Sequence, residues 1–124
     1  MSILKAFTTH LLEFIDDVQR IFPDDHDVKV ARNSIDAIRR VNPRKMIEFW
    51  RYYVAEPYRE RIEASDITFF LEKEYGEDLQ DANNQDTILQ SIERLREPIR
   101  QMSSSNQEKA MKYIQNLTKL CLMY

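Results

Sequence analysis

Apolar side chains recur along most of the chain with the three- and four-residue spacing of an α-helix. Between residues 2 and 22 they form two interleaved seven-residue series, which predict one amphipathic helix that Pro23 ends. The two series are Leu4, Leu11, Val18 and Phe7, Phe14, Ile21. A further stripe predicts a second helix that runs to about Val41, and it consists of Val28, Ala31, Ile35 and Ile38.

The start of the third predicted helix is marked by its capping residues. Asn42 is a good N-cap, and Pro43 suits the first helical position, where its missing N–H costs nothing. Pro57 either kinks this helix or begins a new one from a Glu56 cap. The apolar face comprises Met46, Ile47, Trp50, Tyr53, Val54, Tyr58 and Ile62.

The stretch "SDITFFLEKEYG" predicts a short helix that Ser65 or Asp66 caps and that Gly76 closes in the left-handed conformation. The letters "ITFFL" would also suit a buried strand, so residues 66–71 stay open between helix and strand. A polar, acidic connector without periodicity follows.

Two helices are expected in the C-terminal third. The first carries a stripe that Pro98 should kink or split, namely Ile88, Ile92, Leu95, Ile99 and Met102. Ser105 and Glu108 have the spacing of a capping box for the last helix. That helix carries Met111, Ile114, Leu117, Leu120 and Cys121, and the apolar end "LCLMY" is expected to dock on something.

Composition agrees with a helical fold. One glycine and four prolines leave few residues for hairpin turns, while 43% of the 124 residues are hydrophobic. A chain of this length can bury roughly two thirds of its unfolded surface. We therefore expect an all-α fold, a compact single-domain bundle of five to seven helices over residues 1–124.

Charge and cysteine content narrow the function classes. A net charge of −3 argues against a globally basic nucleic-acid binder, and a lone cysteine, Cys121, allows neither an internal disulfide nor a Cys-rich zinc site. The sequence contains no run of about 18 apolar residues, so no membrane span is predicted. The N-terminal stretch "MSILKAFTTHLLEF" carries charge too early for a signal peptide. We expect a soluble intracellular protein.

The stretch "FPDDHDVKV" raises the question of a metal or acid/base site, because it places Asp24, Asp25, His26 and Asp27 side by side. An EF-hand needs ligands spread over twelve residues with a central glycine, and helical metal sites need His and carboxylates three or four apart. His10 and Glu13 have that spacing, but no second copy exists. We favour a turn in which Asp25 or Asp27 caps the next helix, and the role of an exposed His26 stays open.

Catalysis is not expected from the remaining residues. Cys121 lies on an apolar helical face, where cysteine usually packs, and one glycine excludes "GxSxG", phosphate-loop and dinucleotide motifs. A metal-dependent enzyme using the Asp24–Asp27 cluster is the least favoured hypothesis. The chain is predicted to be no enzyme and to need no cofactor.

Charged residues are unevenly distributed. Between residues 29 and 51, only Asp36 and Glu48 oppose seven basic residues, Lys29, Arg32, Arg39, Arg40, Arg44, Lys45 and Arg51. From residue 66 to 86, seven acids stand against Lys73. The basic segment could meet phosphate or an acidic neighbouring chain, whereas in the alternative the two segments are solvated faces that pair within the monomer.

Aromatic residues crowd the segment "FWRYYVAEPY". Trp50 and Tyr53 share a face and are expected in the core, whereas Tyr52 falls off that stripe beside Arg51, and Tyr and Arg are residue types that anchor interfaces. Partly exposed aromatics at a helix edge are the plainer alternative. The candidate interface residues are Arg39, Arg40, Arg44, Lys45, Arg51, Tyr52, Tyr58 and Tyr124.

Three stretches resemble a family of small helical proteins encoded by large icosahedral double-stranded DNA viruses, the algal viruses and their giant-virus relatives. They are "LLEFIDDVQRIFPDDHDVKVA", "VNPRKMIEFWRYYVAEPYRERIEASDITFFLEKEYGEDL" and "NQEKAMKYIQNLTKL". The resemblance covers most of the chain, and none of its motifs carries catalytic chemistry.

This resemblance implies a viral protein found in the virion and, during infection, in the host cell cytoplasm. Its expected role is that of a minor capsid protein that contacts other viral structural proteins of the capsid lattice. The alternative is an intracellular viral adaptor or regulator that binds nucleic acid through Arg39, Arg40, Arg44 and Lys45.

Overall fold

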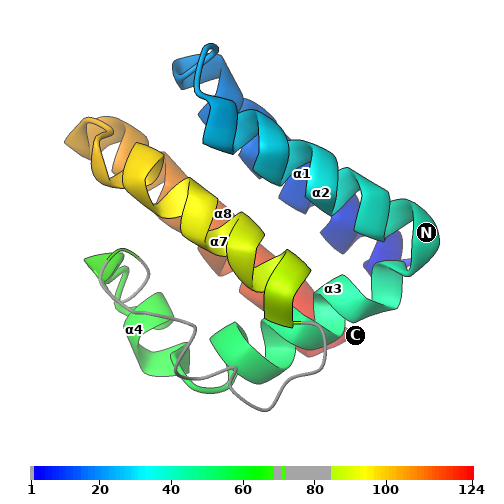
Figure 1. Ribbon diagram of the computed structural model, residues 1–124. Helices are drawn as coiled ribbons and strands as arrows, with labels where there is room; N and C mark the ends of the chain where they lie inside the picture. Colours follow the sequence, from blue (N-terminus) through cyan, green and yellow to red (C-terminus); the bar gives the residue numbers. More distant parts are fainter. Residues whose placement is uncertain (1, 69–70, 72–84) are drawn as a thin grey trace.

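The computed structural model describes residues 2–68, 71 and 85–124, and their regular structure is entirely helical (Figure 1). The longer helices are α1 (Ile3–Ile21), α2 (His26–Val41), α7 (Gln85–Arg100) and α8 (Ser104–Met123). The shorter ones are α3 (Pro43–Trp50), the π-helix η1 (Arg51–Ala55) and α4 (Arg59–Glu63). The all-α prediction is therefore confirmed. The predictions for Gly76, for the acidic connector and for the side chains of Ile88 and Ile92 lie outside the described residues.

The four long helices form the body of the molecule. Helix α1 packs between α2 and α8, and α2 also packs against α7. The segment α3–η1–α4 lies along one side of this body (Figure 1). Helices α3 and η1 contact the C-terminal half of α8, and Gln115 of α8 donates to the Ile62 carbonyl of α4. Among the described helices, none combines the length and the apolar character that a membrane crossing needs.

Helix boundaries follow the sequence signals at the N-terminal half of the chain. The Ser2 side chain accepts the Lys5 N–H and starts α1, which ends at Ile21 just before Pro23. Asp25 caps α2 by accepting the Val28 N–H at 3.1 Å. Asn42 and Pro43 take the expected N-cap and first positions of α3, although the Asn42 side chain makes no capping hydrogen bond.

Near the C-terminus, the cap of α8 and the end of α7 differ from the predictions. The cap of α8 is Ser103, whose Oγ accepts the Asn106 N–H, so Ser105 lies in the first turn and no capping box forms with Glu108. Pro98 does not split its helix, because it falls in the last turn, two residues before α7 ends at Arg100.

The region around Pro57 also differs from the prediction. The residue at the N-cap position of α4 is Tyr58 and not Glu56. Helix α4 ends in a Schellman motif, with Asp66 N–H bonding to Arg61 C=O and Ser65 at φ 59° in the left-handed position. Within the stretch left open between helix and strand, Thr68 and Leu71 are helical.

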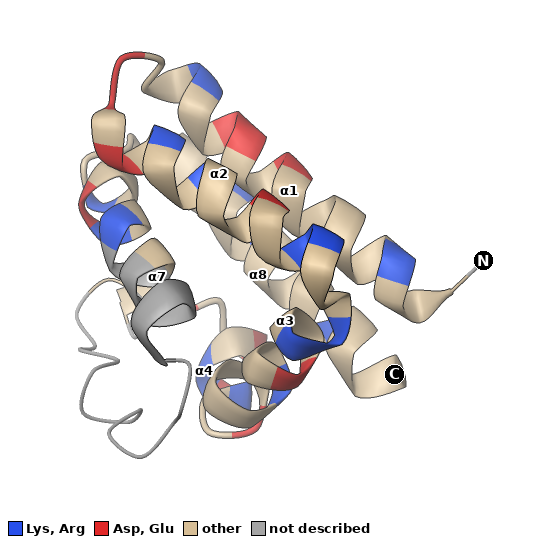
Figure 2. Ribbon diagram, turned by 45° about the vertical axis from the view of Figure 1, so that its right-hand side comes forward, with Lys and Arg blue, Asp and Glu red and all other residues tan. Residues whose placement is uncertain are grey.

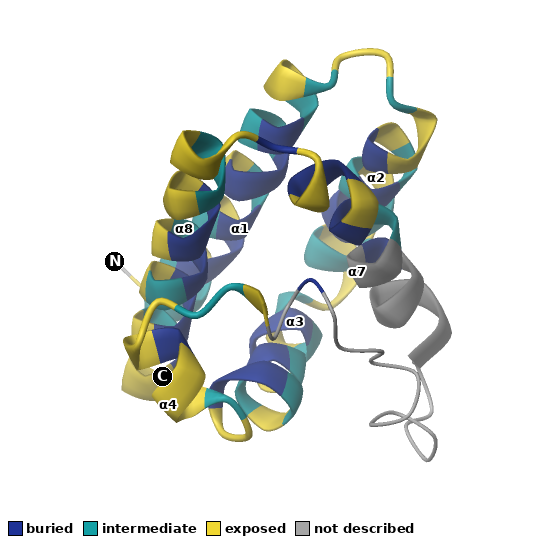
Figure 3. Cartoon of the chain, turned by 90° about the vertical axis from the view of Figure 1, so that its left-hand side faces the viewer, coloured by how far each residue is buried: buried dark blue, intermediate teal, exposed yellow. Residues whose placement is uncertain are grey.

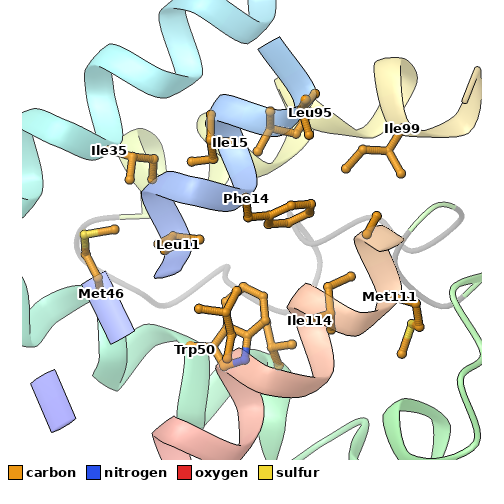
Figure 4. Close-up of a cluster of buried hydrophobic side chains, with 14 of the residues drawn as sticks. Leu11, Phe14, Ile15, Ile35, Met46, Trp50, Leu95, Ile99, Met111 and Ile114 are labelled. Carbon is orange, nitrogen blue, oxygen red and sulfur yellow. The ribbon is translucent and has the colours of Figure 1, made fainter. Parts of the chain in front are cut away.

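Side chains from α1, α2, α3, α7 and α8 meet in a common apolar core (Figure 4). The predicted stripes supply most of it, except that Ile21 is 40% exposed. Five further stripe residues are only partly buried, including Tyr53, which was expected in the core: Leu4, Ile38, Tyr53, Tyr58 and Leu120. Trp50 is 6% exposed, packs edge-on against Phe7, and donates its Nε1–H to Thr118 Oγ1 at 3.0 Å. The indole N–H is therefore satisfied inside the core, which anchors α3 to α8.

Candidate interaction surfaces

The Asp24–Asp27 cluster does not converge on a site. Asp25 caps α2, Asp27 pairs with Arg94 of α7 at 2.6 Å, and Asp24 and His26 are exposed. Among the residues that the structure describes, no group of three or more His, Cys, Asp and Glu side chains could hold a metal ion. Asp25 and Asp27 thus act in a helix cap and an ion pair, and Asp24 and His26 lie at the surface.

Cys121 is buried, as the sequence predicted for a packing residue. Its Sγ lies 3.4 Å from the Ile47 carbonyl oxygen, and burial raises the pKa of the thiol. A raised thiol pKa disfavours the thiolate, the nucleophilic form. The surroundings of Cys121 are therefore those of a structural cysteine.

A groove of about 750 Å³ runs between α1 and α8, with Lys5, His10, Glu13 and Lys119 among its lining residues. His10 stands beside Glu13, with 3.5 Å between Nδ1 and Oε2, and its ring lies 4.8 Å from that of Tyr113. The Tyr113 hydroxyl donates to Asp17, and burial together with this bond raises the pKa of Tyr113 to about 12. These contacts tie α1 to α8.

The first candidate interaction surface is the aromatic end, which we define as Tyr52 together with Leu122, Met123 and Tyr124. Their exposed fractions are 67% for Tyr52, 42% for Leu122, 68% for Met123 and 44% for Tyr124. Large apolar side chains exposed on neighbouring segments are typical of contact sites. Figure 3 shows this exposed C-terminal end of α8 beyond its buried stripe.

Arg51 joins the two segments of the aromatic end. Its Nη2 donates to the Cys121 carbonyl, and its Cζ lies 6.0 Å from the centre of the Tyr124 ring. The Cys121 carbonyl also accepts the Tyr124 N–H at 3.2 Å, so the guanidinium adds a second, charged donor to this carbonyl and holds the end of α8 on η1. The expected docking of the apolar tail thus occurs in part on the chain itself.

The neighbouring tyrosines differ in exposure. The Tyr52 ring packs edge-on against Tyr53 at 4.9 Å, and Tyr53 packs on Phe49 at 5.0 Å. Tyr58 is half-buried against the core, so less of its ring faces outward than that of Tyr52. The sequence did not indicate that Arg51–Ala55 is a π-helix, a form that often occurs at functional sites.

The second candidate surface is the basic corner, which we define as Arg39, Arg40, Arg44 and Lys45, where α2 passes into α3. Figure 2 shows the blue Lys and Arg positions gathered at this corner. Within the described part of the chain, Arg44 and Lys45 form no ion pair, and Val41 beside them is 85% exposed. The four predicted basic residues thus lie on the last turn of α2 and the first turn of α3.

Asp36 organises the arginines of this corner. Arg39 Nε and Nη2 both donate to its Oδ1 at 3.1 and 2.7 Å, and Arg40 Nη2 lies 2.8 Å from its Oδ2. The hydrogen bond from Arg39 holds the pKa of Asp36 below its ordinary 3.8, with Arg40 and Arg32 acting in the same direction against the effect of burial. From the sequence alone, Asp36 is only one of two acids that oppose seven basic residues.

Neither family models, nor curated proteins, nor solved structures gave a match to this chain.

Proposed function

We propose that this chain is a non-enzymatic structural protein of a virus particle, a minor capsid component that docks on neighbouring capsid proteins through its aromatic end. The observation that carries the proposal is the exposure of Tyr52, Met123 and Tyr124 on two segments that Arg51 holds together. Tyr, Met and Arg are enriched in the centres of protein interfaces. The viral setting rests on the resemblance of the sequence.

The preorganisation of the aromatic end favours binding. The C-terminal residues of a helix usually fray, and ordering them on contact would cost free energy. Here Arg51 fixes the end of α8 to η1, and Tyr52 stands on a segment whose neighbours Trp50 and Val54 are buried. A partner would therefore meet an apolar surface that is already in place.

Mass spectrometry of purified particles tests the proposal. We expect the chain to remain with the capsid proteins after density-gradient purification and a high-salt wash. Its absence from particles, together with abundance in infected cells, would contradict the proposal. A Tyr52→Ala, Met123→Ala variant should be incorporated less than wild type, whereas Lys112→Ala, at an exposed position of α8, should be incorporated normally.

A second function is favoured by a separate observation, the arrangement of arginines around Asp36. In this alternative the chain is an intracellular viral adaptor or regulator that contacts nucleic acid through the basic 29–51 segment. The same particle measurement separates the two, because a regulator would accumulate in the host cytoplasm and stay out of the purified capsid.

A further inference from the structure

The arginines around Asp36 form an ordered cluster. Arg32, Arg39 and Arg40 all approach this one carboxylate, whose side chain is 11% exposed. Arg32 is additionally held by Asp16, with 3.1 Å between Nε and Oδ1. The spacing explains the arrangement, because positions i−4, i+3 and i+4 lie on the same helix face as residue i.

The arginine side chains of the cluster remain partly exposed. A guanidinium has five N–H groups, and Arg40 directs only Nη2 to Asp36, while its side chain remains 70% exposed. Arg39 is 40% exposed and uses Nε and Nη2 on the same carboxylate oxygen. A buried carboxylate thus fixes two arginine side chains while leaving much of their hydrogen-bonding capacity to a ligand.

The positive charge extends beyond the cluster. Arg44 and Lys45 follow on the first turn of α3, and neither makes an ion pair with another described residue. The four basic residues of the corner and the one carboxylate of Asp36 give a local charge of about +3. Salt screens charges over ~8 Å, so a ligand at this corner responds to the local charge more than to the net charge of −3.

We propose that the basic corner binds the phosphate backbone of a nucleic acid, with Asp36 as a positioning residue that holds Arg39 and Arg40 in place. Guanidinium groups match phosphate oxygens in geometry and charge. The last turn of α2 and the first turn of α3 supply the four basic side chains of this surface. A duplex carries about one charge per 1.7 Å of its axis, so such a surface faces several phosphates rather than one. The inference rests on the second of the two proposed functions and does not depend on the aromatic end.

The direct test is fluorescence anisotropy with a labelled 20-base-pair duplex of mixed sequence at 50 and 200 mM salt. We expect wild-type binding that weakens with salt, and about tenfold weaker binding for Arg40→Ala, Arg44→Ala at low salt. Losing two phosphate contacts should also make the logarithmic salt slope shallower by about 1.8. The matched control is Lys112→Ala, Lys119→Ala, which removes equal charge from exposed positions of α8 and should bind within twofold of wild type.

Equal losses in both double variants would contradict a local site, because only overall charge would then matter. No salt-dependent binding by the wild type would overturn the proposal outright. Polyglutamate is the parallel probe: if it binds at the basic corner and the duplex does not, the surface fits an acidic protein, and the nucleic-acid proposal fails.

Asp36→Asn tests the positioning role separately. This variant is one charge more positive, so plain electrostatic attraction would tighten its binding, whereas loss of the arginine arrangement should weaken it about threefold or more. Circular dichroism first establishes that the variant is folded. Tighter binding by the folded variant would rule out the positioning role, and if the variant is unfolded, the two surface variants still decide the binding site.

Discussion

The aromatic end and the basic corner lie at the two ends of the segment Pro43–Ala55, yet they are held in place by different forces. The aromatic end stands on buried packing, because Trp50 and Val54 are inserted in the core beside it. The basic corner stands on one carboxylate, Asp36, which gathers side chains at the surface. We therefore expect the aromatic end to lose its structure when the core is destabilised. The basic corner should instead change when charge or pH is altered.

The largest effect is expected from Trp50→Ala. Truncating a buried aromatic side chain costs about 3–5 kcal/mol of unfolding free energy, since both transfer and cavity terms are lost. The matched control is Tyr52→Ala, two residues away but 67% exposed, which should stay within about 0.5 kcal/mol of wild type. Urea unfolding measures both, and similar losses in the two variants would show that the aromatic end is not built on the core.

A smaller loss is expected from Thr118→Val, which keeps the shape of the side chain but removes the oxygen that accepts the Trp50 Nε1–H. Leaving a buried donor unsatisfied costs about 1–3 kcal/mol. Pairing this change with Trp50→Phe in a double-mutant cycle isolates the hydrogen bond. Purely additive free energies would mean that the bond contributes nothing to the junction of α3 and α8.

Arg51→Ala should cost about 1 kcal/mol, because it removes a partly exposed charged donor from the Cys121 carbonyl. The stronger signal should be local: faster amide hydrogen exchange in the last turn of α8, with little change in α1. Arg44→Ala, which breaks no ion pair among the described residues, is the control. Unchanged exchange at residues 121–124 would remove the argument that the aromatic end is preorganised.

The smallest change is expected from acid titration at Asp36. Its folded pKa lies below the ordinary value of 3.8, so the carboxylate stabilises the fold above that pH, and the contribution is lost as the pH falls through the folded pKa. The difference in unfolding free energy between wild type and Asp36→Asn should therefore shrink below about pH 3.8. A constant difference from pH 7 to pH 2.5 would show that Asp36 acts through shape alone.

Local sequence rules predicted the N-terminal half of the fold well. Pro23, Asp25 and Pro43 act within one helical turn of their own positions, so their effects can be read without the tertiary structure. Ser103 and Ser105 illustrate the limit, because three consecutive serines are all competent caps and only the structure shows that Ser103 is the one used. The π-helix after Trp50 is likewise seen only in the structure.

For the two candidate surfaces, the sequence indicated which residues are involved but not which groups these residues contact. Arg39, Arg40, Arg44 and Lys45 are a basic run in the sequence, and the structure places them on the adjoining turns of α2 and α3. The role of Asp36 could have been inferred from the i−4, i+3 and i+4 spacing of its arginines. The inward contact of Arg51 with Cys121 could not, because the two are far apart in sequence.

Site-specific photocrosslinking in assembled particles tests most directly the central claim, that the aromatic end contacts a neighbouring capsid component. A photoreactive phenylalanine analogue placed at Tyr52, and separately at the exposed position Lys112 of α8 as the control, reports which face touches a neighbour. We expect a crosslink from position 52 to a capsid protein and none from position 112. Crosslinks from position 112 alone, or none from position 52 in particles that contain the chain, would contradict the claim.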